Sequence, residues 1–339
     1  MKIREKVLIM FGMADEVGVQ RLKEEVEVVV VVPTLDEAKL LKEVADAAVI
    51  VVGPPPVARE AVHDVTTKMI QTGEKLKAAV MIGRPGDLLD FRLATSRGMV
   101  VLTSGLHGPT VAEHSLALML CAAKRIQYLG EEFRRGRFTY NMRLAWRGDE
   151  LTGKTAGLVG FGNIGRCLAA KLKYGFDMKV LAYDPHVMLH QADEIGVTLV
   201  DRLSTLLAGV DFVFCQAQLT GETRHIIGSK ELAQMKRTAY LVNTTPGLVD
   251  EQALTEALQK GIIAGAGIDV YDPDPPEDPV NNPLFAMPNV ALTPHMAGFG
   301  KDHFRRVALD QATQIIAFLR GEKPRYVLPV PLEMTKELS

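Results

Sequence analysis

Apolar and charged segments alternate along the first hundred residues. Residues 7–11 are apolar and predict a first β-strand, and the amphipathic stretch at residues 35–44 is typical of a helix. Further apolar runs follow at residues 27–33, 47–53, 77–83 and 99–104. Short apolar runs separated by amphipathic stretches are typical of βαβ units, whose parallel strands are buried on both faces. The pattern therefore predicts an α/β unit at the start of the chain.

A second and larger alternating series follows a long helical pattern. From Pro109 the helical pattern continues without further Gly or Pro to about Leu129, which predicts one long helix. The apolar runs of the second series are at residues 155–160, 179–184, 197–200, 211–216, 239–244, 263–270 and 289–293. A Gly-containing segment after His295 leads into an amphipathic helix at residues 302–319. If that helix packs on the first unit, the first domain is discontinuous.

Composition favours an ordinary globular protein. The chain has 339 residues, 47% of them apolar, and a formal net charge of −2, so it has length enough for two domains. Interspersed charges without a basic run predict no nucleic-acid partner. Since the apolar runs are too short for a signal peptide or a membrane span, we expect a soluble cytoplasmic protein. His186 and His190 lack the Glu of a zinc motif, so we expect no metal.

The strongest local signal is a glycine-rich turn between a strand and a helix. Residues 160–165 read Gly-Phe-Gly-Asn-Ile-Gly, directly after an apolar run. Gly160 allows the tight turn, Gly162 lets the backbone approach a pyrophosphate, and Gly165 permits close packing of helix on strand. The helix N-terminus, at Asn163 and Ile164, would receive the phosphates. The pattern predicts a dinucleotide site, although a strand-to-helix turn without a ligand is the simpler alternative.

An acidic residue at the end of the next strand selects the dinucleotide. Asp184 lies about 20 residues after the turn, where a carboxylate accepts hydrogen bonds from the ribose hydroxyls. Such a carboxylate repels a 2′-phosphate, and the following Pro185 and His186 supply no guanidinium, so NAD is expected rather than NADP. Arg166, in the first turn of the helix, either touches a phosphate or is a solvated surface residue.

Several further motifs follow one another along the chain. They are Thr-Val-Ala-Glu-His at 110–114, Gly-Lys-Thr at 153–155, Thr-Gly-Glu-Thr-Arg-His at 220–225, Leu-Val-Asn-Thr at 241–244, Gly-Ile-Asp-Val-Tyr at 267–271 and Leu-Thr-Pro-His at 292–295. In this order they resemble the D-isomer-specific 2-hydroxyacid dehydrogenases over nearly the whole chain. The resemblance implies two doubly wound parallel-sheet domains. A Rossmann NAD-binding domain would span residues 109–297, and a discontinuous flavodoxin-like substrate domain would combine residues 1–108 with 298–339.

The resemblance also implies roles for individual residues. His295 takes the position of the family's catalytic acid or base. An imidazole suits that task because the ordinary pKa of histidine is close to neutral pH. The family's Glu that orients this His lies five residues after Asp269, where this chain has Asp274. The Asp274 side chain is one methylene shorter than Glu, so it reaches less far toward His295. The alternative is that Asp274 is a solvated acidic residue of the loop without a role in catalysis. Asp269 resembles the residue that bonds the nicotinamide carboxamide, and Thr244 falls beside the same ring.

The chain departs from the family where the substrate carboxylate binds. The family places Arg directly before Gly247, and this chain has Pro246. The Gly-x-Gly loop that holds the carboxylate reads Gly-Arg-Pro-Gly at 83–86, so Pro85 removes an N–H donor while Arg84 adds a guanidinium. His107 stands where relatives often have Asn. These changes predict a rebuilt pocket in which Arg84 replaces the missing clamp and His107 adds a polar contact.

Two classes of function fit these observations. The leading hypothesis is an active NAD-dependent dehydrogenase of the D-2-hydroxyacid type. Arg84 indicates that its small substrate is anionic. In a variant of this hypothesis, the enzyme acts on a substrate that has no 2-carboxylate. The alternative is an NAD(H)-binding sensor or scaffold that has lost efficient catalysis, for which Pro246 is the best evidence. By resemblance we expect a homodimer, with residues 127–146 as a candidate interface, although a solvated helix is equally compatible.

Overall fold

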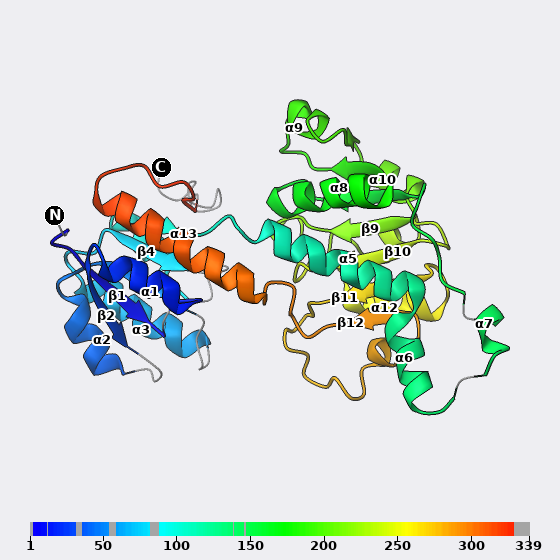
Figure 1. Cartoon of the computed structure of the whole chain (residues 1–339), viewed down its shortest axis with the longest axis horizontal. Helices are drawn as coiled ribbons and strands as arrows, with labels where there is room; N and C mark the ends of the chain where they lie inside the picture. Colours follow the sequence, from blue (N-terminus) through cyan, green and yellow to red (C-terminus); the bar gives the residue numbers. More distant parts are fainter. Residues whose placement is uncertain are drawn as a thin grey trace. The chain divides into compact units, whose positions relative to one another are not determined.

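The computed structural model describes residues 3–11, 13–31, 36–53, 59–81, 88–137, 139–145 and 147–328. The chain forms two compact units (Figure 1). Unit 1 combines Met1–Leu106 with Lys301–Ser339, and unit 2 is His107–Gly300. Both are built around parallel sheets, so the α/β fold class expected from the alternating pattern is confirmed.

Unit 1 contains a five-stranded parallel sheet in the order β2-β1-β3-β4-β5, which is the flavodoxin-like order. Its strands are β1 (Lys6–Met10), β2 (Glu27–Val31), β3 (Ala47–Val52), β4 (Ala78–Met81) and β5 (Val100–Leu102). Its helices are α1 (Glu16–Lys23), α2 (Glu37–Val44), α3 (Arg59–Thr72), α4 (Phe91–Ser96) and α13 (Lys301–Leu319). Because α13 packs against α1, unit 1 is assembled from two separate stretches of chain (Figure 1).

The alternation of side chains along β1 gives unit 1 a core on each face of the sheet. Leu8 and Met10 join a cluster with residues of α2, α3 and α4. Val7 and Ile9 join a second cluster with residues of α1 and with Ile315 of α13. Full burial of an aliphatic side chain contributes about 1.5 to 3 kcal/mol, so both helical layers are held by hydrophobic packing.

Unit 2 contains a seven-stranded parallel sheet in the order β12-β11-β10-β9-β6-β7-β8. Its strands are β6 (Thr155–Val159), β7 (Lys179–Tyr183), β8 (Thr198–Leu199), β9 (Phe212–Cys215), β10 (Tyr240–Asn243), β11 (Gly265–Ile268) and β12 (Val290–Leu292). Its helices are α5 (Gly108–Lys124), α6 (Ile126–Arg134), α7 (Met142–Ala145), α8 (Asn163–Phe176), α9 (Leu189–Asp193), α10 (Leu203–Gly209), α11 (Ser229–Leu232), α12 (Glu251–Gln259) and the 3₁₀ helix η2 (Pro283–Ala286). Strand β6 pairs with both β7 and β9, so the strand order reverses there. In such sheets ligands bind outside the carboxyl ends of the strands, beside that reversal.

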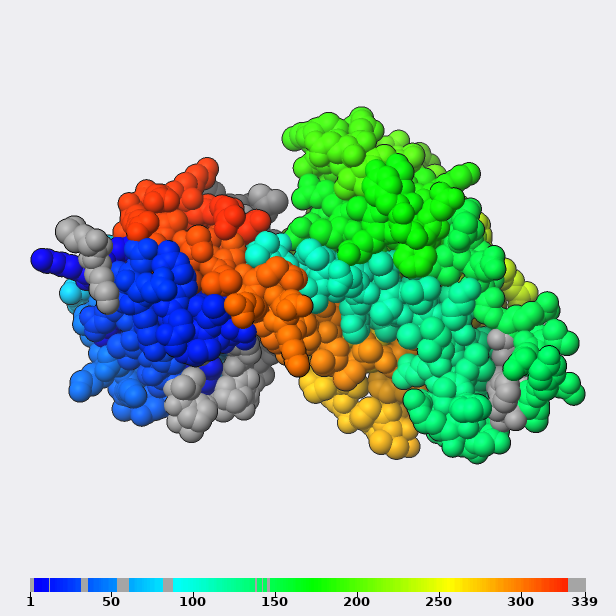
Figure 2. All heavy atoms as spheres, viewed as in Figure 1, coloured from blue at the N-terminus to red at the C-terminus, as the bar shows by residue number. Residues whose placement is uncertain are grey.

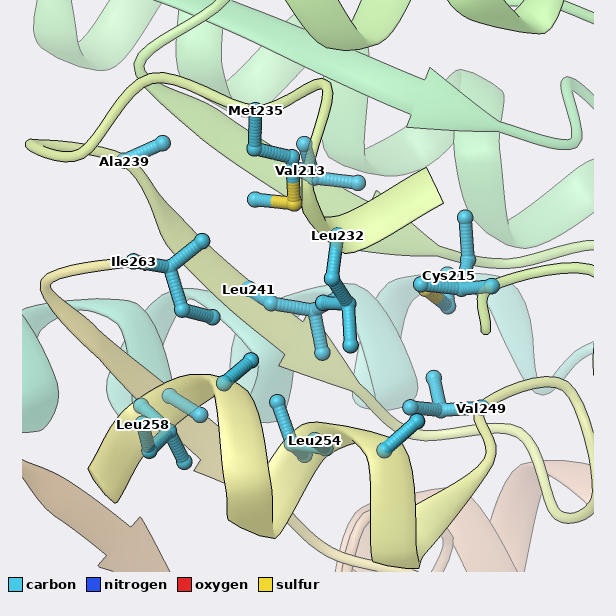
Figure 3. Close-up of a cluster of buried hydrophobic side chains, with 14 of the residues drawn as sticks. Val213, Cys215, Leu232, Met235, Ala239, Leu241, Val249, Leu254, Leu258 and Ile263 are labelled. Atoms are coloured by element: carbon cyan, nitrogen blue, oxygen red, sulfur yellow. The ribbon is translucent and has the colours of Figure 1, made fainter. Parts of the chain in front are cut away.

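Helices cover both faces of the sheet of unit 2. Residues of α5 and α8 pack on one face. On the other face, α11 and α12 pack on β9 and β10, and Figure 3 shows Leu232, Leu254 and Leu258 turned toward Val213 and Leu241 of the strands. The strands between these layers are fixed by packing on both sides, which gives the loops at their carboxyl ends a rigid base.

The long helix predicted from Pro109 to about Leu129 ends earlier, so that prediction was wrong in its second part. Helix α5 ends at Lys124, and Arg125 adopts the left-handed conformation with φ 54°. The amide of Arg125 bonds the carbonyls of Ala122 and Cys121, which caps the helix. Helix α6 then begins in a new direction (Figure 1). A left-handed Arg carries no sequence signal comparable to Gly.

Residues 126–137 and 139–145, here called the arm, include α6 and α7. The arm carries large apolar side chains at the surface: Phe133 is 68% exposed and Leu144 is 74% exposed. Figure 2 shows this stretch as a projection at the edge of unit 2. Among the described helices of both units, none is long and apolar enough to cross a membrane.

Candidate active site

The glycine-rich turn joins the central strand β6 to helix α8, and close packing dictates two of its glycines. Gly160 has φ 99°, and a Cβ there would lie 2.4 Å from the backbone nitrogen of Ala217. A Cβ on Gly165 would lie 2.5 Å from the carbonyl oxygen of Gly160. Both contacts are with backbone, which cannot give way cheaply, so a side chain is sterically forbidden behind the turn.

The front of the same turn is open. A Cβ on Gly162 would meet no atom within 4 Å, and Gly162 is the N-cap of α8 without a side chain to cap the helix. The amides of Asn163, Ile164 and Gly165 are therefore in the first turn, where a helix has no carbonyl partners of its own. Arg166 is half-buried in the same turn. The turn is thus packed against backbone at Gly160 and Gly165 and open at Gly162 and the start of α8, an arrangement that fits the pyrophosphate of a dinucleotide.

Asp184 follows β7 and is tied to the glycine-rich turn. Its Oδ2 accepts a hydrogen bond from the amide of Phe161 at 2.8 Å, and its Oδ1 accepts one from the amide of His186 at 2.9 Å. Each carboxylate oxygen has a second lone pair, so the half-buried side chain can still accept ribose hydroxyls. These amide bonds hold the carboxylate at the carboxyl end of the sheet in a fixed orientation.

Thr244, at the end of β10, belongs to a buried polar network. Gln216, which follows β9, donates through Nε2 to the hydroxyl of Thr244 at 3.0 Å and to that of Ser115 at 3.2 Å. Ser115 on α5 donates to the carbonyl of Val111 at 2.9 Å. All three polar side chains are buried. The network fixes the position of the Thr244 hydroxyl, whereas its predicted place beside the nicotinamide stays a prediction.

Asp269, directly after β11, is fully buried and holds the segment that carries His295. Its Oδ1 accepts hydrogen bonds from the hydroxyl of Thr293 at 2.6 Å and the amide of Met296 at 2.7 Å. Its Oδ2 accepts one from the amide of Ala297 at 2.9 Å. The amide of His295 donates to the carbonyl of Asp269 at 2.7 Å. Asp269 thus brackets His295 on both sides, a role that reasoning from motifs missed.

His295 and Asp274 meet, as the resemblance implied. The Nδ1 atom of His295 contacts Oδ2 of Asp274, while the imidazole is 45% exposed and the carboxylate side chain 20% exposed. The loss of one methylene relative to Glu has not broken the contact. Since Nδ1 is engaged by a carboxylate, Nε2 is the ring nitrogen left to exchange a proton with a substrate.

The structure describes two of the three positions at which the predicted substrate pocket departs from the family. Pro246 is half-buried in the turn after β10, and His107 is half-buried at the start of α5. Arg84 lies outside the described residues. One guanidinium does lie beside the Pro246 turn: Nη1 of Arg224 is 3.4 Å from where a Cβ on Gly247 would be, and its Nη2 donates to Asp272 at 3.0 Å. In the described part of the chain, no three His, Cys, Asp or Glu side chains form a group that could hold a metal.

A parallel sheet with this strand order, an open glycine-rich turn between β6 and α8, and a fixed carboxylate after β7 define a dinucleotide-binding domain. Residues 116–297 match the family model described as D-isomer specific 2-hydroxyacid dehydrogenase, NAD binding domain. The chain belongs to this family, and the cofactor of the domain is NAD.

Individual relatives extend the match to both units. The chain is 37% identical over 316 residues to the D-3-phosphoglycerate dehydrogenase of Methanocaldococcus jannaschii, a match that covers 92% of this chain and 57% of that protein. With the D-3-phosphoglycerate dehydrogenase of Archaeoglobus fulgidus it shares 38% identity, over 50% of that protein. The chain thus spans about half the length of these two relatives. The hydroxypyruvate reductase of Thermotoga maritima is 35% identical and is covered over 94% of its length, with 89% of this chain.

Solved structures share the fold of the chain over nearly its whole length. The TT0316 protein of Thermus thermophilus has a TM-score of 0.78 and 31% identity, covering 96% of this chain and 100% of that one. The apo D-mandelate dehydrogenase of Rhodotorula graminis has a TM-score of 0.85, covering 96% and 98% of the two chains, at 24% identity. The second likeness supports the fold alone.

Proposed function

We propose that the protein is an NAD-dependent oxidoreductase that transfers a hydride between the nicotinamide and a small 2-hydroxy or 2-keto acid, or a related carbonyl compound. The observation that carries this proposal is the contact of His295 with Asp274 at the carboxyl end of the sheet that binds the dinucleotide. In the same proposal, residues 109–297 bind NAD and residues 1–108 with 298–339 bind the substrate. The cytoplasm is the compartment expected for such an enzyme.

The chemistry assigned to the protein is proton transfer and positioning. When bound, NADH supplies the hydride and NAD⁺ accepts it. In reduction, His295 donates the proton on Nε2 to the carbonyl oxygen as that oxygen gains charge, and Asp274 stabilises the imidazolium before transfer and orients the ring. In oxidation, neutral His295 accepts the hydroxyl proton at the same nitrogen. A positioned acid or base contributes roughly 10²- to 10⁴-fold in rate.

Arg84 is our candidate for the substrate carboxylate, because Pro246 leaves the family position without a guanidinium. Charge-assisted hydrogen bonds contribute about 1.5 to 3 kcal/mol each, so Arg84→Ala is expected to raise KM for an anionic substrate by about tenfold or more. Arg224→Gln is the matched control, since Arg224 is already paired with Asp272. An unchanged KM in the Arg84 variant, or an equal rise in the control, contradicts this assignment.

An NAD(H)-binding sensor or scaffold remains the second candidate, and the absence of Arg at position 246 is the observation that favours it. A pure binding module has no need for a solvent-accessible imidazole held by a carboxylate. We therefore favour the enzyme.

The test is NADH oxidation over a panel that includes glyoxylate, hydroxypyruvate and carbonyl compounds without a carboxylate, with oxidation of D-3-phosphoglycerate assayed in the reverse direction. His295→Ala is assayed beside the unaltered protein, and NADH affinity is measured for both. Turnover that falls at least about 100-fold in the variant, with NADH affinity retained, supports the enzyme. Tight NADH binding without turnover on the whole panel supports the sensor.

We further propose that two copies of the chain associate through the arm, extending the expectation for residues 127–146. Its exposed side chains include Phe133, Tyr140 at 74% and Leu144. Burying such side chains against a second copy removes apolar surface from water. Sedimentation should show a dimer that Leu144→Glu dissociates and the control Tyr174→Glu, at a 72% exposed position on α8, leaves intact. A monomeric unaltered protein contradicts the proposal.

A further inference from the structure

A second histidine lies behind the catalytic pair, and motif comparison assigned it no role. His114 is in the second turn of α5, with a side chain 22% exposed. Its Nε2 lies 2.8 Å from the hydroxyl oxygen of Thr293 and 3.2 Å from Oδ1 of Asp269. His114 therefore reaches, from a helix that covers the sheet, the two side chains that fix the segment around His295.

The other hydrogen bond of Thr293 determines which atom donates between His114 and Thr293. An ionised carboxylate only accepts, so the 2.6 Å contact between Thr293 and Asp269 uses the single hydroxyl hydrogen of Thr293. Thr293 has no hydrogen left for His114 and must accept from it. The hydrogen between His114 and Thr293 therefore resides on Nε2 of the imidazole, and the same N–H is shared with Asp269.

The charge state assumed for Asp269 has physical support. Burial raises the pKa of this carboxyl, but hydrogen bonds from His114, from Thr293 and from the amides of Ala297 and Met296 outweigh burial and hold the pKa below its ordinary value. Asp269 is therefore ionised at neutral pH, and each of these donors compensates a buried charge.

We propose that His114 is a positioning residue for the reaction: its Nε2–H donates to Asp269 and Thr293 and thereby fixes segment 293–297, from which His295 acts. This role rests on the proposed function. His295 itself adopts the left-handed conformation with φ 54°, which is unfavourable for a non-glycine residue and persists only where the surroundings impose it. The bonds centred on Asp269 impose it here, and His114 completes them.

A pair of amide variants separates this role from simple packing. In His114→Gln the side-chain amide nitrogen takes the place of Nε2 and keeps the donor. In His114→Asn the amide is shorter by one methylene, takes the place of Nδ1 and cannot reach Thr293. Both variants remove the ring, but Asn also leaves a larger cavity, so urea unfolding of both variants is measured and kcat is compared under conditions in which both are fully folded.

The kinetic test compares kcat and KM of both variants with the unaltered protein in the panel assay. We expect His114→Gln to retain kcat within about threefold and His114→Asn to lose about tenfold or more, because a donor to a buried charge is lost. KM for NADH should change little in either variant. Equal kcat in the two variants contradicts the proposal.

A second readout is independent of activity. In ¹⁵N–¹H spectra of histidine-labelled protein at about pH 8, above the ordinary histidine pKa, the resonances missing from His114→Gln identify His114. We expect the Nε2–H tautomer, and an Nδ1–H tautomer overturns the proposal whatever the kinetics show. If the unaltered protein has no turnover, the proposed function fails while the tautomer still decides the role of His114 toward Asp269.

Discussion

The contact between Asp274 and His295 gives the sharpest prediction about catalysis. The carboxylate engages Nδ1, which fixes the ring orientation and leaves Nε2 to the substrate. Asp274→Asn keeps the size of the side chain but removes its charge. The amide also has donors as well as an acceptor, so it can hold the imidazole in the wrong tautomer.

The magnitude follows from the kind of bond that is lost. A hydrogen bond to a charged group contributes about 1.5 to 3 kcal/mol, and a tenfold rate change corresponds to about 1.4 kcal/mol. Because the imidazole is 45% exposed, solvent screens the pair and the effect belongs to the lower part of that range. We expect kcat to fall about 10- to 30-fold.

The assay is steady-state reduction of the best substrate in the panel, with NADH affinity measured separately. Asp274→Glu is the control, because it restores the residue that the family has at this position and keeps the carboxylate. We expect the Glu variant to retain kcat within about threefold and NADH affinity to be unchanged in both variants. A kcat for Asp274→Asn within about twofold of the unaltered protein would refute the reasoning that Asp274 supports His295.

Three further predictions concern the cofactor cradle and the buried carboxylate. Gly165→Ala places a Cβ 2.5 Å from the carbonyl of Gly160, so urea unfolding should show a loss of about 1 to 3 kcal/mol, and an unaltered midpoint contradicts the packing argument. Asp184→Asn removes a charge that would repel a 2′-phosphate by about 1 to 4 kcal/mol, so the ratio of the NADPH to the NADH Kd should fall at least about fivefold. Asp269 has a lowered pKa in the folded chain, so its stabilisation is present above the unfolded value of about 3.9 and is lost as pH falls through the folded value. The free energy of unfolding, measured between about pH 3 and 7, should therefore fall less steeply with falling pH in Asp269→Asn than in the unaltered protein. The same slope in both proteins contradicts a stabilising role for the Asp269 charge.

The sequence predicted the parts of the site that depend on local chain geometry. The strand, glycines and helix at residues 155–176 follow from contacts within one βαβ unit, and Asp184 directly follows the next strand of that unit. The end of α5 was missed because Arg125 takes a left-handed conformation that requires no glycine when the cap bonds are made.

Residues that act together from distant parts of the chain were harder to predict. The bonds to Asp269 come from His114 on α5 and from the segment after β12, and no spacing rule links these positions. The reach of Asp274 depends on the path of a proline-rich loop, so the sequence left open whether a shorter carboxylate could still touch His295. Arg84 lies outside the described residues, and its role stays a prediction.

Hydride transfer to a carbonyl carbon can be followed with an isotope label on the cofactor. NADH with deuterium at both hydrogen positions of C4 is incubated with the protein and each 2-keto acid or related carbonyl compound of the panel. The product is then analysed by mass spectrometry. We expect a hydroxy product that carries one deuterium on the former carbonyl carbon, formed by the unaltered protein and at least about 100-fold more slowly by His295→Ala. NADH that binds tightly but delivers no deuterium to any compound would contradict it.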